Sequence, residues 1–286
     1  MGFWTPVSDT SEAVSMPNGR YTTVGIISLF ILVAMGISML LAPWLTPYDP
    51  IDMDHKSQLL PPSWAHPFGT DLFGRDVLTR VLYGARRSLS VGVLAALLAA
   101  LPGLVLGLMS GYFGGPFDHI LMRLTDIALA FPSLILSLGI VAILEPGLVN
   151  VTIAVGLAGI PGYVRFVRSN VLKVKETLYV EAAEAIGCSS GRIILRHILP
   201  NIAASVLVLV TMDVAWAILR ATSLSFLGLG AQPPTPEWGA MIDAGRELLR
   251  IAPWVSLAPS GVMMLAVLSI NLLGDALADA LDPRSE

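Results

Sequence analysis

Long apolar runs alternate with shorter polar segments along most of the sequence. A helix rises about 1.5 Å per residue, so roughly 20 apolar residues are needed to cross a hydrocarbon core of about 30 Å. Six runs are long enough and carry few or no charges. They predict six transmembrane helices, at residues 21–45, 89–112, 120–143, 148–167, 201–224 and 255–277. The expected fold class is therefore an all-α, polytopic integral membrane protein.

The polar segments suggest how the spans are connected. Residues 1–20 contain one basic residue, Arg20, which is a poor start for a cleaved signal peptide. The run that follows is too long for such a peptide, so we interpret it as an uncleaved first span. The short connection at 145–150 predicts an antiparallel pair of the third and fourth spans. Three longer connections should have structure of their own, at residues 46–88, 168–200 and 228–254.

The composition agrees with a surface that lipid covers. Hydrophobic residues make up 55% of the 286 residues and charged residues only 13%, against roughly 25% charged in soluble domains. The mean hydropathy is +0.74. A net charge of −4 argues against nucleic acid as a partner. The single cysteine, Cys188, excludes an internal disulfide, and the four scattered histidines lack ligand spacing, so no metal site is predicted.

Basic residues give only a weak indication of orientation. The connection 168–200 with Arg165 carries six of them, and the connection 46–88 carries five. The positive-inside rule then places 168–200 in the cytoplasm. With six spans, both termini are cytoplasmic too, residues 1–20 form a cytoplasmic segment, and the connections 46–88 and 228–254 are external.

Three charged residues lie inside predicted spans, where charge is costly and usually faces the bundle interior or a water-filled cavity. They are Asp126, Asp213 and Arg220. The last two are seven residues apart, so they share one face of a helix with about 10 Å of rise between them. Two interpretations stay open: these charges line a pathway, or they pair with one another or with a neighbouring subunit.

The most informative segment lies between the fourth and fifth spans. Residues 179–186 are good helix formers, and Gly187 stands where a helix would end in a left-handed turn. A second short helix is expected from Ser190, ending before Pro200 and Asn201. A short helix held at the membrane surface can dock into a groove of a soluble partner. We therefore predict a helix–glycine–helix lever with no chemistry of its own.

This segment resembles the EAA loop of ATP-binding-cassette (ABC) importer permeases. That motif reads Glu-Ala-Ala, three residues, Gly, nine residues, Ile, one residue, Leu-Pro. Here the position of the isoleucine holds His197, with Ile198 next to it. The residues that match, and that the resemblance implies as the ATPase-coupling site, are Glu181, Ala182, Ala183, Gly187, Leu199 and Pro200.

Further stretches resemble one branch of this family, the second permease subunit of dipeptide, oligopeptide and nickel importers. Examples are His66-Pro-Phe-Gly-Thr-Asp71 and Pro233-Pro-Thr-Pro-Glu-Trp-Gly239. Others occur at residues 72–76, 83–86, 111–115, 224–230, 271–275 and 279–283. The likeness covers nearly the whole chain from residue 21, so residues 21–286 are expected to form one six-span permease domain.

The resemblance implies a transport subunit of the cell membrane, with no catalytic residue and no cofactor of its own. The implied partners are a second permease subunit, two ATPase subunits that bind ATP and magnesium, and an extracytoplasmic substrate-binding protein. Di- and oligopeptides are the expected cargo, with nickel, glutathione or another small solute as alternatives. Two other classes of membrane protein fit the sequence less well. A stand-alone secondary transporter has no use for a docking loop, and a membrane-embedded enzyme needs a convergent catalytic set that the spans lack.

Overall fold

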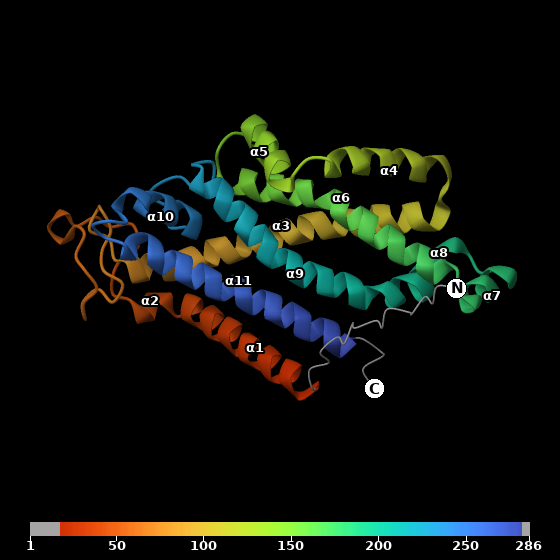
Figure 1. The fold of residues 1–286 in the computed structure, drawn as a ribbon, viewed down its shortest axis with the longest axis horizontal. Helices are drawn as coiled ribbons and strands as arrows, with labels where there is room; N and C mark the ends of the chain where they lie inside the picture. Colours follow the sequence, from red (N-terminus) through yellow and green to blue (C-terminus); the bar gives the residue numbers. More distant parts are fainter. Residues whose placement is uncertain (1–17, 282–286) are drawn as a thin grey trace, which may run out of the picture.

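The computed structural model describes residues 18–281, and these fold into helices joined by connections of varied length, the longest between α2 and α3 (Figure 1). Most of the predicted segment 1–20 therefore lies outside the described residues. The α-helices are α1 (Asn18–Leu40), α2 (Ala42–Leu45), α3 (Val77–Phe113), α4 (Gly115–Leu129), α5 (Ser133–Leu144), α6 (Leu148–Lys175), α7 (Leu178–Ala185), α8 (Ser190–Ile193), α9 (Leu199–Phe226), α10 (Trp238–Gly245) and α11 (Trp254–Leu281). Short turns η1 (His55–Ser57), η2 (Ile194–Ile198) and η3 (Arg246–Leu248) complete the set.

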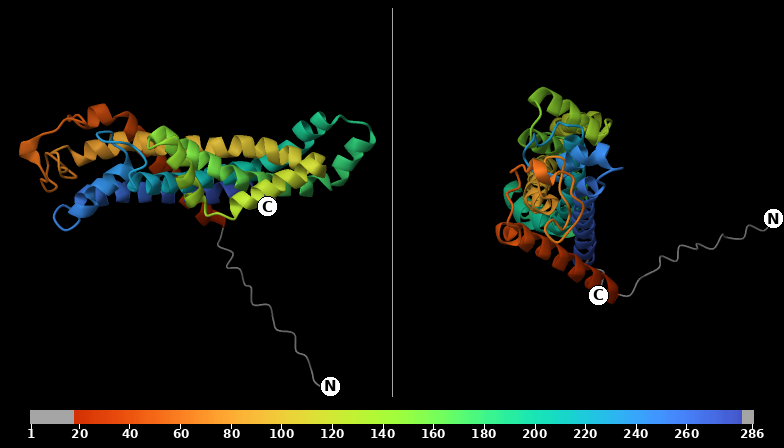
Figure 2. Two further views of the ribbon diagram at one scale, coloured as in Figure 1. Left: turned by 90° about the horizontal axis from the view of Figure 1, so that it is seen from above. Right: turned by 90° about the vertical axis from the view of Figure 1, so that its left-hand side faces the viewer.

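The long helices run side by side and give the molecule an elongated shape (Figures 1 and 2). Five segments within the described residues are long and apolar enough to cross a membrane: α1, α3, α6, the stretch from α8 to the end of α9, and α11. The pair α4 and α5 raises the number to six if it is counted as one bent span. The predicted all-α, polytopic membrane fold is confirmed.

The third predicted span is not one straight helix. The chain bends by 93° between α4 and α5, inside the segment 120–143 that the sequence predicted as a single helix. Pro132 causes the break, because proline lacks a backbone N–H and disfavours helical geometry at the residue before it. Its backbone adopts ψ 131°, outside the helical region. The prediction of an unbroken helix here was wrong.

A second proline, Pro200, does not interrupt the helical path of the chain. The sequence predicted that the helix from Ser190 would end before Pro200, yet α8, η2 and α9 follow one another without a break. The turn η2 is a π-helix, in which the N–H of Leu199 donates to the carbonyl of Ile194, five residues back. This wider turn directly precedes Pro200, which takes a place in the first turn of α9 where its missing N–H costs little.

The second span also begins earlier than predicted. Helix α3 starts at Val77, so the boundary drawn at residue 88 falls inside it. The carboxylate of Asp76 caps its first turn by accepting hydrogen bonds from the backbone N–H and the hydroxyl of Thr79, at 2.7 and 2.6 Å. The basic residues 80, 86 and 87 therefore lie on the first turns of α3 and not in the connection before it.

A stripe of glycines brings α3 and α6 into close contact. A Cβ atom at Gly103, Gly107 or Gly111 would come within 2.3, 2.7 and 2.8 Å of the Cβ atoms of the residues opposite. Those residues on α6 are Tyr163, Val167 and Val171. The spacing of four keeps all three glycines on one face of α3, the small-residue pattern that lets membrane helices approach closely. This packing was not part of the sequence prediction.

Substitution of Gly107 by leucine should destabilise the bundle. A side chain at this position overlaps Val167, and overpacking of this kind costs about 1–3 kcal/mol. We expect a lower thermal midpoint for the purified chain in detergent. The matched control is Gly261→Leu in α11, where nothing lies within 4 Å of an added Cβ. Equal midpoints for the two variants would show that the α3–α6 contact is not tight.

Candidate functional site

Helix α7 lies at one end of the elongated bundle, while α10, η1 and the loop that follows α2 lie at the other (Figures 1 and 2). Two residues of α7, Val180 and Ala183, are buried against the body of the protein. They belong to an apolar cluster that joins α7 to α3, α6, η2 and α9. Its other members are Leu108, Tyr112, Val167, Val171, Ile193, Ile198, Ile202 and Val206. The position of α7 is thus fixed by packing.

The opposite face of α7 is open. Glu181, Ala182 and Gly187 are exposed, and Glu181 lies in the first turn, where a negative charge interacts favourably with the helix dipole. Leu178 and Ile186 bracket this face and are 82% and 81% exposed. Leu178 and Ile186 thus add two large apolar side chains to a surface that also carries the charge of Glu181.

Gly187 ends α7 as the sequence predicted. Its φ of +81° lies in the left-handed region, which favours glycine. The N–H of Gly187 donates to the carbonyl of Glu184 at 2.9 Å, and the N–H of Cys188 donates to the carbonyl of Ala183 at 3.0 Å. These two bonds form a Schellman motif, which fixes the direction in which the chain leaves the helix. Cys188 packs against the apolar cluster, a contact that often accompanies this motif.

The second half of the segment is built into α9. Leu199 is half-buried against the apolar cluster, and Pro200 is exposed. His197, at the position where the EAA motif has isoleucine, places its ring 6.3 Å from the ring of Tyr179. The adjacent Ile198 is fully buried in the cluster. Of the six predicted coupling residues, Ala183 and Leu199 therefore contribute to packing, and the other four lie on the exposed surface.

Polar contacts tie this end of the bundle together. Lys175, the last residue of α6, donates to the backbone carbonyl of Tyr112 at 2.8 Å, and the hydroxyl of Tyr112 contacts Glu184 of α7 at 3.4 Å. Arg168 of α6 forms a two-pronged ion pair with Asp118 of α4, at 2.5 and 2.7 Å. Spacing along the chain could not reveal this ion pair, because its partners are 50 residues apart.

Asp126 pairs with Arg165 of α6. Both side chains remain about half exposed on the surface of this chain. A charged pair in a membrane helix avoids lipid, so this face of α4 and α6 is expected to meet water or another subunit. Asp126, Asp118 and their two arginines thus connect α4 to α6 along the half of α6 that leads to α7.

Asp213 and Arg220 form the pair that their seven-residue spacing allowed. The guanidinium donates to the Asp213 carboxylate at 2.6 Å, and both side chains are largely buried, at 16% and 14% exposed. The hydroxyl of Tyr163 on α6 donates to the second carboxylate oxygen at 3.3 Å. Asp213 therefore links the two helices, α6 and α9, that enter and leave the α7 segment.

Removal of Asp213 should leave a buried, unpaired arginine. Loss of one partner of a buried ion pair costs about 3–5 kcal/mol, so Asp213→Ala should lower the free energy of unfolding by that order. The double variant Asp213→Ala/Arg220→Leu removes both charges and should recover most of the loss. A urea titration of the purified chain in detergent measures this, and equal losses in both variants would contradict a structural pair.

The other end of the bundle is a compact cap. Glu237 accepts hydrogen bonds from the backbone N–H groups of residues 239 and 240 and from the hydroxyl of Ser88. Trp238 is fully buried, and its indole N–H donates to the carbonyl of Val81 at 3.1 Å. Both residues therefore have a structural role in the connection between α9 and α11.

In the same cap, the hydroxyl of Ser57 and then the backbone N–H of Lys56 donate hydrogen bonds to Asp54, and these hold the pKa of its carboxyl below its usual range.

The two histidines of the cap stand apart. His66 bonds Asp76 at 3.0 Å, and His55 contacts Gln58 at 3.3 Å. Within residues 18–281, no three side chains of the ligating types gather as a metal site would require. The candidate site that the structure does assemble is a short exposed helix packed on three long ones.

Comparison with known proteins assigns this arrangement to a family. The family model described as binding-protein-dependent transport system inner membrane component matches residues 103–286. A second model, the N-terminal TM domain of oligopeptide transport permease C, matches residues 23–62.

Individual relatives are similar over most of their length. The chain is 45% identical to the dipeptide transport system permease protein DppC of Alkalihalophilus pseudofirmus, over 98% of this chain and 92% of the relative. It is 44% identical to the glutathione transport system permease protein GsiD of Pectobacterium atrosepticum, over 90% of this chain and 85% of the relative. The GsiD protein of Escherichia coli O157:H7 is 45% identical over the same shares.

Proposed function

This chain belongs to the family of binding-protein-dependent transport system inner membrane components, and we propose that it forms half of the translocation pathway of an ABC importer for short peptides. The observation that carries the proposal is α7, which is anchored by two buried residues and presents an exposed apolar face at the end of the bundle. A stand-alone secondary transporter would have no partner for this face.

The partners in this proposal are a second permease, two ATPase subunits and an extracytoplasmic substrate-binding protein. ATP and magnesium bind to the ATPases, so hydrolysis takes place outside this chain. The face formed by Glu181, Ala182 and Gly187 docks into a groove of one ATPase. Closure of the ATPase pair on ATP then moves α7.

Movement of α7 reaches the membrane through short, stiff connections. Only two residues separate α6 from α7, and Val180 and Ala183 hold α7 against α3, α6 and α9. The ion pairs of Asp118 and Asp126 with α6, and the contact between Tyr163 and Asp213, carry the movement of α6 to α4 and α9. The bundle then alternates between outward-open and inward-open states, a two-state equilibrium that ATP shifts from a distance.

Orientation follows from the position of α7. If α7 faces the cytoplasm to meet the ATPase, the cap with α10 and η1 is external. Helices α1 and α11 have one end near the cap and the other directed toward the side of the bundle that carries α7 (Figure 1). Both termini are then cytoplasmic, in the cell membrane.

Peptide cargo is supported by the relatives, which are named for dipeptide and for glutathione, itself a tripeptide. The test is uptake of a labelled dipeptide by cells with and without this chain, with excess unlabelled tripeptide or nickel as competitor. We expect uptake that requires the chain and that the tripeptide reduces. Unchanged uptake on deletion would contradict the peptide assignment, and competition by nickel alone would redirect it to metal.

A further inference from the structure

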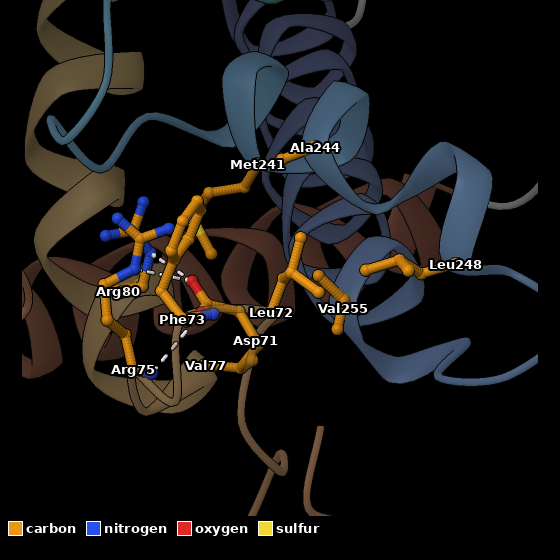
Figure 3. A pocket seen from close by; sticks show the side chains of 10 residues that line it. All are labelled: Asp71, Leu72, Phe73, Arg75, Val77, Arg80, Met241, Ala244, Leu248 and Val255. Atoms are coloured by element: carbon orange, nitrogen blue, oxygen red, sulfur yellow. Dashed lines mark hydrogen bonds and ion pairs between the residues drawn. The ribbon is translucent and has the colours of Figure 1, made fainter. Parts of the chain in front are cut away.

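A cavity of about 250 Å³ opens in the cap, between the segment that precedes α3 and the helices α10 and η3 (Figure 3). It lies at the end of the bundle opposite α7, which is the external end under the proposed function. Arg75, Arg80 and Asp71 line one part of it, and apolar residues that include Met241, Leu248 and Val255 line the rest. The proposed function assigns no role to this cavity.

The charges in the cavity do not balance. Arg75 and Arg80 are 5% and 6% exposed, and Asp71 is the only acidic residue among the described residues that line it. The Nε of Arg75 donates to Asp71 at 2.7 Å, and the Nε of Arg80 lies 3.6 Å from the same oxygen. The carboxylate of Asp71 is thus shared by two buried guanidinium groups. A net buried positive charge is costly unless an anion joins it.

The terminal nitrogens of Arg75 and Arg80 differ in the hydrogen bonds that they already donate within the chain. Arg80 donates through Nη1 to the carbonyls of Pro50 and Pro234, at 2.7 and 3.2 Å, so it holds the cap together. Within residues 18–281, the side chain of Arg75 donates a hydrogen bond only through Nε, and its guanidinium lies over the ring of Phe73, 4.6 Å from the ring centre. The outer fork of Arg75 therefore keeps donors available, in the geometry that suits a carboxylate.

The other acids of the described cap do not line the cavity. Asp76 caps α3 and bonds His66, and Glu237 caps α10. Asp243 and Glu247 both lie near Arg246, at 3.5 and 3.9 Å. Arg86 and Arg87, further along α3, add positive charge to this end of the described chain without ion-pair partners of their own there. Among residues 18–281, Asp71 is thus the one acid that lines the cavity, and an anion that balances the second arginine would have to enter from outside this part of the chain.

Size and lining define which anion fits. The remaining walls are apolar, and the volume is below the roughly 300–1,000 Å³ of pockets that enclose drug-sized ligands. We propose that the cavity binds the carboxyl-terminal residue of a peptide, with its carboxylate on Arg75 and its apolar side chain against Met241 and Leu248. This inference rests on the proposed function, because it takes peptides as the cargo.

The direct test is equilibrium binding to the chain purified with its partner subunits in nanodiscs. Radiolabelled N-acetylleucine carries the carboxylate and an apolar side chain, and N-acetylleucinamide lacks the charge. We expect the amide to bind at least tenfold more weakly. Arg75→Gln should weaken N-acetylleucine binding to a similar extent, and it leaves Asp71 paired with Arg80.

A second variant keeps the test sound if Arg75→Gln fails to assemble. Ala244 lies exposed at the rim of the cavity, so Ala244→Phe should fill the cavity without disturbing the charges. It should also reduce N-acetylleucine binding at least tenfold. Equal binding of acid and amide, or undiminished binding in both variants, would overturn the proposal. Dipeptide uptake measured in parallel separates the two failures, because normal uptake without N-acetylleucine binding leaves the proposed function intact.

Discussion

Substitution of Gly187 by valine is expected to reduce transport at least tenfold while ATP hydrolysis by the assembled complex continues. The backbone of Gly187 has φ +81°, where a residue with a Cβ costs about 1–2 kcal/mol and a β-branched one more. The space around it is open, with nothing within 4 Å of an added Cβ. The cost is therefore backbone strain, which disturbs the turn without affecting insertion of the spans.

Loss of this turn should uncouple ATP hydrolysis by the ATPase subunits from movement of the membrane helices. The Schellman bonds to Ala183 and Glu184 set the angle at which α7 meets the chain that returns to α9. If that angle relaxes, the ATPase moves α7 without moving the bundle. Transport and hydrolysis are measured together in proteoliposomes. Gly187→Asn is the control, because asparagine tolerates the left-handed region, and it should retain most transport. Normal transport by Gly187→Val would contradict the lever.

Ile186→Asp should abolish stable association with the ATPase subunits. Ile186 is 81% exposed on the face of α7 that the proposal places in the groove. Burial of an isoleucine side chain contributes about 1.5–3 kcal/mol, and an unpaired carboxylate in its place adds a desolvation penalty. At roughly tenfold per 1.4 kcal/mol, affinity should fall about 100-fold or more.

The chain offers a matched control for this change. Ile251, at the opposite end of the molecule, is 71% exposed, so Ile251→Asp introduces the same charge on a face that the ATPase does not reach. Affinity purification of the tagged chain measures the ATPase recovered with each variant. Equal recovery for Ile186→Asp and Ile251→Asp would show that α7 is not the docking surface.

The sequence was sufficient to predict features that depend on local chemistry. The apolar runs predicted the membrane helices, and Gly187 predicted the left-handed end of α7, because only glycine adopts that geometry without cost. The spacing of Asp213 and Arg220 allowed the ion pair that the structure forms. In each of these cases, the interacting groups are close in the sequence.

Features that depend on tertiary packing were missed. Pro132 breaks its helix and Pro200 does not, although both stand inside apolar stretches. The difference is the π turn before Pro200, where Ile193 and Ile198 are held in the apolar cluster around α7. The pair of Asp118 with Arg168 joins residues 50 apart, which spacing cannot reveal. The stripe from Gly103 to Gly111, in contrast, could have been predicted from its spacing of four.

The most direct test of the central claim is dipeptide accumulation in proteoliposomes that contain the purified complex, with ATP enclosed and the binding protein outside. The proposed function predicts accumulation that requires enclosed, hydrolysable ATP and is lost in Ile186→Asp. Accumulation that is indifferent to ATP and follows an imposed proton gradient would contradict it, and would identify the chain as a secondary transporter.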